Sequence, residues 1–117
     1  MRKQVFFIAR FLLLGGAIAG ASLAAPLVAA APGHSVTVVI SNMSFGRVPA
    51  DLKVGDTVVW VNRDTVPHTV TARDRSFDLH VAPGQSASQT LGKAGTFPFY
   101  CIYHSAMRGT LKVASAS

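Results

Sequence analysis

Residues 95–109 read GTFPFYCIYHSAMRG and hold the only cysteine of the 117-residue chain. Cys101, His104 and Met107 follow one another in the pattern C-x2-H-x2-M. A thiolate, an imidazole and a thioether form a soft ligand set, and one more imidazole would complete a site suited to a copper ion that cycles between Cu(II) and Cu(I). This stretch therefore predicts a copper site, for which another part of the chain supplies the second imidazole.

Three further histidines are available, namely His34, His68 and His80. His68 directly follows Pro67, where a loop gives way to the β-forming segment HTVTA. A side chain at such a junction can project from the end of a β-sandwich, where the loop with Cys101 must also lie. His34 lies near the start of the expected domain and His80 lies next to a turn, so we expect both to be solvated. The sequence favours His68 as the second imidazole.

From His34 onward the sequence shows the apolar alternation and turn residues of short strands, with no helical period longer than a turn. The expected strands cover residues 36–40, 51–54, 57–62, 68–72, 77–81, 86–91, 97–101 and 109–113. Residues 42–46 are expected to form a bend. Trp60 is expected in the core. This spacing predicts an all-β fold, a Greek-key β-sandwich or small barrel of seven or eight strands.

Residues 1–30 are expected to be a signal peptide. The first ten residues contain Arg2, Lys3 and Arg10 without an acid, and an uncharged run rich in Leu, Ala and Gly follows to about residue 31. Cleavage is expected near residue 24 or residue 30. About 20 uncharged residues could instead span a bilayer as an uncleaved anchor. We therefore expect one exported, periplasmic domain over residues 31–117.

The charge of the expected domain is mildly positive. Without the three basic residues of the leader, eight Lys and Arg face five Asp. Because no Lys/Arg run is interleaved with aromatic residues, the composition argues against a nucleic-acid binder and fits steering towards an acidic protein partner. A lone cysteine cannot form an internal disulfide, and an exported free thiol is open to oxidation, so metal binding explains Cys101 economically.

Two other interpretations of the cluster stay open at this point. The cysteine could be a small core residue, the histidine a surface residue and the methionine core filler, brought close only by coincidence. Zinc could also bind these ligands, although a thioether contributes little to Zn²⁺ and structural zinc sites usually contain more cysteines.

Several segments together resemble the cupredoxins, the type 1 or blue-copper proteins, and within them the amicyanins. These segments are Val54–Arg63 (VGDTVVWVNR), Pro67-His68, Ala94–Phe97 (AGTF) and the Cys101–Gly109 loop with its C-x2-H-x2-M spacing. The resemblance runs from about residue 36 to residue 113. The short interval between the second histidine and the methionine is typical of the amicyanins.

The resemblance implies a cupredoxin-like Greek-key β-sandwich with one type 1 copper ion. His68, Cys101 and His104 would be the equatorial ligands and Met107 the weak axial ligand. It implies a monomeric one-electron carrier, not an enzyme, with an amine dehydrogenase as possible donor and a c-type cytochrome as possible acceptor. The alternative is a periplasmic copper carrier or scavenger without an electron-transfer role.

The resemblance also implies supporting residues. Asn62 matches a position that helps to hold the site. Thr69 stands where cupredoxins usually have an asparagine that ties the two ligand loops together, and since a hydroxyl reaches less far than an amide, we expect an altered tie and a displaced reduction potential. An apolar docking patch is expected around the exposed edge of His104, made of Met43, Val66, Pro67, Tyr103 and Ala106.

Overall fold

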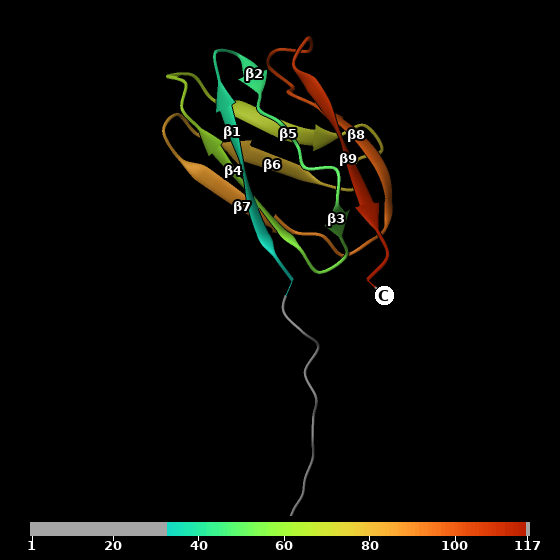
Figure 1. The fold of residues 1–117 in the computed structure, drawn as a ribbon. Helices are drawn as coiled ribbons and strands as arrows, with labels where there is room; N and C mark the ends of the chain where they lie inside the picture. Colours follow the sequence, from blue (N-terminus) through green and yellow to red (C-terminus); the bar gives the residue numbers. More distant parts are fainter. Residues whose placement is uncertain (1–32, 117) are drawn as a thin grey trace, which may run out of the picture. The chain divides into compact units, whose positions relative to one another are not determined.

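A computed structural model describes residues 33–116, and the expected leader, residues 1–30, lies outside the described residues. These residues form nine strands arranged in two sheets (Figure 1). Within residues 33–116, no helix is long and apolar enough to cross a membrane. The all-β prediction is therefore confirmed.

The first sheet has the strand order β2-β1-β4-β7. Its strands are β1 (Ser35–Ser41), β2 (Ser44–Phe45), β4 (Thr57–Asn62) and β7 (Ser86–Thr90). β4 lies in the middle of this sheet, between β1, with which it is parallel, and β7, with which it is antiparallel. This central place agrees with its β-branched sequence, TVVWVN, in which every second side chain is buried.

The second sheet has the strand order β3-β9-β8-β5-β6. Its strands are β3 (Leu52–Lys53), β5 (His68–Ala72), β6 (Asp78–Val81), β8 (Gly95–Tyr100) and β9 (Arg108–Ala114). All five side chains of β5 are buried. Both faces of this strand are therefore covered, the inner face by the core and the outer face by polar contacts of Thr69 and Thr71.

The core between the sheets is built around three aromatic rings. Phe99 packs edge-to-face against Phe45 at 4.9 Å and against Trp60 at 5.3 Å between ring centroids. Trp60 and Phe99 are fully buried, and Nε1 of Trp60 donates a hydrogen bond to Gln89. Phe97 and Phe99 of β8 and Cys101 directly after it are all buried, which fits the alternation of side chains along an extended segment.

The prediction of a bend over residues 42–46 is confirmed for the turn residues Asn42 and Met43 and is wrong for Ser44 and Phe45, which form the additional strand β2. Ile40 pairs with Phe45 and Ser41 with Ser44, so β1 and β2 form a hairpin with a two-residue turn. Both turn residues, Asn42 and Met43, have positive φ angles of 54° and 59°. Two such angles define the type I′ turn that matches the twist of a two-residue hairpin.

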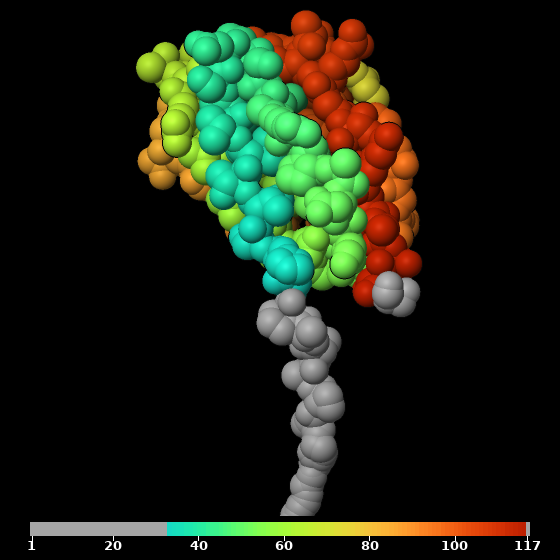
Figure 2. Space-filling model, viewed as in Figure 1, coloured from blue at the N-terminus to red at the C-terminus, as the bar shows by residue number. Residues whose placement is uncertain are grey.

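Three connections lie at one end of this sandwich, at the top of Figure 1: the β1–β2 turn, the loop from β4 to β5 and the loop from β8 to β9. Figure 2 shows the β1–β2 turn and the β8–β9 loop on the surface at that end. The predicted ligands Cys101, His104 and Met107 lie in the last of these loops, and His68 begins β5.

Candidate metal centre

The loop that carries Cys101, His104 and Met107 is closed by its own backbone. The Cys101 amide donates to the Met107 carbonyl (3.1 Å), the His104 amide to the Cys101 carbonyl (3.3 Å) and the Met107 amide to the His104 carbonyl (2.8 Å). The loop therefore leaves β8 at Cys101 and returns to β9 directly after Met107. The spacing of three residues places one potential ligand at each of these hydrogen-bonded positions.

His68 reaches the same place from the other side. It is the first residue of β5, and its side chain is fully buried. Pro67 before it has no N–H to donate, which suits the end of a loop rather than the interior of a ladder. The prediction that His68 stands at a loop-to-strand junction is confirmed.

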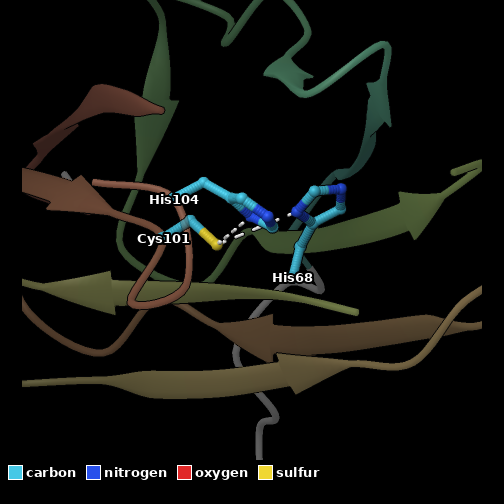
Figure 3. Close-up of side chains that lie close together, drawn as sticks. All are labelled: His68, Cys101 and His104. Atoms are coloured by element: carbon cyan, nitrogen blue, oxygen red, sulfur yellow. Dashed lines mark hydrogen bonds between the residues drawn. The ribbon is translucent and has the colours of Figure 1, made fainter. Parts of the chain in front are cut away.

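His68, Cys101 and His104 form one cluster, in which the potential ligand atoms all lie within 4.8 Å of one another. Sγ of Cys101 lies 3.8 Å from Nδ1 of His68 and 3.6 Å from Nδ1 of His104. Figure 3 shows both imidazole rings turned towards the sulfur.

These separations fit ligands of a single small ion. With bond lengths of about 2.3 Å to sulfur and about 2.0 Å to nitrogen, as in tetrahedral zinc sites, sulfur and nitrogen atoms lie about 3.5 to 3.8 Å apart at ligand angles between about 110° and 120°. The cluster can therefore hold a metal ion, and a thiolate with two imidazoles is a donor set that suits copper.

Asp64 is the neighbour that orients His68. Its Oδ2 atom lies 2.8 Å from Nε2 of His68. The amide of Met43 holds the pKa of Asp64 below its ordinary value, and the hydrogen bond to His68 and the amide of Asn42 lower it further. A carboxylate only accepts hydrogen bonds, so Nε2 of His68 carries the proton and the lone pair of Nδ1 faces Cys101.

Asn62 holds the loop that contains Asp64. Its buried side chain donates to the carbonyls of Val66 (2.8 Å) and Val81 (3.0 Å), and its Oδ1 atom accepts from the amide of Asp64 (2.9 Å). The side chain thereby ties the β4–β5 loop to the end of β6. These contacts agree with the supporting role expected for Asn62.

Thr69 ties the two ligand segments together. Its amide donates to Sγ of Cys101 at 3.4 Å, and its hydroxyl accepts from the amide of Ile102 at 2.9 Å. The shorter hydroxyl of Thr69 therefore still links the two ligand segments. An altered tie and a displaced reduction potential stay predictions.

The remaining histidines lie outside the cluster. The side chain of His34 is 86% exposed and that of His80 is 62% exposed, as expected for solvated histidines. Met107 is buried, with 5% of its surface exposed, in the hydrophobic core cluster that also contains Cys101. Its place in the loop is compatible with an axial ligand, and that role stays a prediction.

The side chains predicted for the docking patch lie at the surface. Met43, Val66, Pro67, Tyr103 and Ala106 are all exposed, and His104 is half-buried. Ile102, which the sequence analysis did not include, is 45% exposed in the same loop. Asp64 was also missed, although its spacing of four residues before His68 was a usable signal.

Comparison with known proteins adds three findings. A family model for the cupredoxin-like domain matches residues 10–113. The chain is 33% identical to an amicyanin of Paracoccus denitrificans over 85 aligned positions, and the match covers 68% of this chain and 65% of the amicyanin. It is 32% identical to a plastocyanin of Prochlorothrix hollandica over 105 aligned positions, and the match covers 74% of this chain and 80% of the plastocyanin.

The fold is also similar to solved structures. The Cu(I) structure of an amicyanin variant superposes with a TM-score of 0.59 at 31% identity, covering 70% of this chain and 82% of that one. The match to the Paracoccus denitrificans amicyanin spans slightly less than two thirds of that relative's length.

Proposed function

The chain belongs to the cupredoxin-like family, and we propose that it is an exported type 1 copper protein that carries single electrons between redox partners. The observation that carries this proposal is the cluster of His68, Cys101 and His104, whose two imidazole nitrogens and one sulfur lie within 4.8 Å of one another. At the level of the family, this is an electron carrier and not an enzyme.

Four residues would hold the copper ion. His68, Cys101 and His104 would supply the three strong ligands, and Met107 a weak axial thioether. Such a set accommodates both Cu(II) and Cu(I), so the bound ion can accept and release one electron with little rearrangement.

The surrounding residues keep this ligand set dry and fixed. His68 and Cys101 are fully buried, so water is excluded from the thiolate side. The amide of Thr69 donates to the sulfur, and Asp64 holds the ring of His68. A site held in one arrangement lowers the reorganisation that electron transfer requires.

His104 would be the route by which electrons enter and leave, because it is the half-exposed member of the cluster. Around it we propose a docking patch made of Met43, Val66, Pro67, Tyr103 and Ala106. Met43 is 43% exposed and Tyr103 is 53% exposed. A small apolar surface favours close, short-lived docking.

The amicyanin relatives support redox proteins as the class of partner. An amine dehydrogenase as donor and a c-type cytochrome as acceptor are the specific partners that we propose, and we propose a periplasmic monomer. Export would depend on residues 1–30 acting as a signal peptide.

Titration of the purified protein with Cu(II) tests the proposal. We expect an intense visible thiolate-to-copper band and an EPR spectrum with narrow hyperfine splitting at one copper per chain. Cys101→Ala should abolish the band. His80→Ala, which alters an exposed histidine outside the cluster, is the matched control and should retain it. A colourless copper complex would contradict the proposal.

The alternative, a copper carrier or scavenger without electron transfer, makes a different prediction. A carrier would bind Cu(I) but would show no reversible Cu(II)/Cu(I) wave and no fast electron exchange between copies. Cyclic voltammetry of the copper-loaded protein therefore separates the two functions.

A further inference from the structure

A chain of polar groups runs along the outer face of β5, from the loop of residues 101–107 (the metal loop) to the surface. Side chains alternate along a strand, so Thr69 and Thr71 point to the face opposite that of Val70. Both threonines are nevertheless buried, with at most 1% of their surface exposed. Their hydroxyls need partners there, and the structure supplies them.

The first links lie at the metal loop. Thr69 accepts a hydrogen bond from the amide of Ile102 at 2.9 Å, directly after Cys101. The hydroxyl of Thr69 in turn lies 2.9 Å from that of Thr71. Oγ1 of Thr71 donates to Oδ1 of Asp78 at 2.7 Å.

The hydroxyl of Thr71 is the donor in both of its hydrogen bonds. Its single hydrogen is shared between Oγ1 of Thr69 and Oδ1 of Asp78, and the carboxylate can only accept. The oxygen of Thr69 thus accepts from Thr71 on one side and from the amide of Ile102 on the other.

We propose that Asp78 is a positioning residue of the metal centre, which acts through Thr71 and Thr69 to fix the amide of Ile102 and with it the loop of Cys101 and His104. Asp78 is half exposed, and its other oxygen lies 3.5 Å from Nε2 of His80. The negative charge of Asp78 is thus coupled to the ligand loop by three consecutive hydrogen bonds. Its effect on a reduction potential rests on the proposed copper function, whereas its effect on the loop does not.

Amide hydrogen exchange of the metal-free protein, followed by NMR, tests the effect on the loop. Thr71→Val removes the central hydroxyl while keeping the shape of the side chain, and we expect the Ile102 amide to exchange about tenfold faster. Thr71→Ser, which restores a hydroxyl, should exchange as the native protein does.

Thr57→Val is the matched control, since it removes a hydroxyl from the Thr57–Thr90 pair of the other sheet. It should leave the exchange of Ile102 unchanged. If Thr71→Val accelerates all amides equally, or leaves Ile102 no faster than the control does, the proposal is overturned.

The reduction potential of the copper-loaded protein tests the effect of the charge. Asp78→Asn keeps an acceptor for Thr71 and removes the negative charge, so Cu(II) loses more stabilisation than Cu(I) and the potential should rise. Asp74→Asn removes a charge from the connection between β5 and β6, where Asp74 accepts from Ser76 instead. An equal rise in both variants would overturn the coupling through the hydrogen bonds.

If copper fails to bind, the proposed function is wrong. The amide hydrogen exchange of Ile102 still decides whether the hydroxyls of Thr69 and Thr71 hold the loop.

Discussion

Oδ2 of Asp64 lies 2.8 Å from Nε2 of the buried His68. The same carboxylate accepts the amides of Asn42 (2.7 Å) and Met43 (2.9 Å) at the β1–β2 turn. One side chain therefore joins a candidate copper ligand to a residue of the proposed docking patch. The turn, the β4–β5 loop and the metal cluster are thus held as one unit.

Replacing Asp64 should weaken copper binding. In Asp64→Ala the ring of His68 loses the acceptor that keeps its proton on Nε2, and loss of such a partner lowers metal affinity about 10- to 100-fold. Competition with a chelator of known copper affinity measures this change. Asp74→Ala removes another turn carboxylate and should bind copper as the native protein does. Unchanged affinity in Asp64→Ala would show that His68 needs no carboxylate.

Gly109 is required by its neighbour across the β8–β9 ladder. It pairs with Phe99, and a Cβ atom at this position would lie 2.5 Å from Cζ of the Phe99 ring. Because that ring is locked against Phe45 and Trp60, we expect Gly109→Ala to lower the free energy of unfolding by about 1–3 kcal/mol. Urea unfolding of the metal-free protein measures this loss.

Two further variants test the cause of that loss. Gly92→Ala is the matched control, since its added Cβ would meet no atom within 4 Å, and it should change stability by less than about 0.5 kcal/mol. Phe99→Leu should reduce the penalty of Gly109→Ala in a double-mutant cycle. Strict additivity of the two changes would argue against a clash with the ring.

The acid stability of the protein should depend on Asp56. The amides of Lys53 and then His34 donate to its carboxylate, both at 2.9 Å, and lower its pKa from the ordinary value of 3.8. Since the folded-state pKa lies below the unfolded one, the carboxylate stabilises the fold above about pH 4, and this stabilisation is lost as the pH falls through the folded-state pKa.

We therefore expect Asp56→Asn to reduce stability at neutral pH and to flatten its decline as the pH falls below about 4. Urea unfolding across that range is the measurement. Asp51→Asn, at an exposed carboxylate, should retain the native slope. A native slope in Asp56→Asn would assign the acid sensitivity to other groups.

Local patterns in the sequence were sufficient to predict the β-sandwich and the cluster of His68, Cys101 and His104. Alternation placed Phe97, Phe99 and Cys101 on one buried face, and the proline before His68 marked the junction at which that ligand enters. These features depend on neighbours within a few residues, so they can be recognised without knowledge of the fold.

The hairpin turn could not be recognised in this way. Two-residue turns of this type favour Asn-Gly, and methionine rarely adopts the positive φ of 59° that Met43 has. The turn amides are held by Asp64, which lies 21 residues further along the chain from Met43. The threonines of β5 are similar. Alternation alone would place Thr69 and Thr71 at a solvated outer face, whereas both are buried and bonded to Asp78 and to the amide of Ile102.

The docking patch can be tested without knowledge of the natural partners, because two copies of an electron carrier exchange electrons with each other. If exchange proceeds through His104, two patches must meet, and a lysine in the patch places like charges opposite each other in a desolvated contact. We expect Tyr103→Lys and Val66→Lys each to slow electron self-exchange at least about tenfold at low salt. NMR line broadening in mixtures of the Cu(I) and Cu(II) proteins measures the rate.

Ser88→Lys adds the same charge at an exposed position of β7 and controls for net charge. Because salt screens repulsion between exposed charges, added salt should recover part of the rate in the patch variants. Equal slowing in Ser88→Lys would indicate that net charge, and not the surface around His104, limits the exchange.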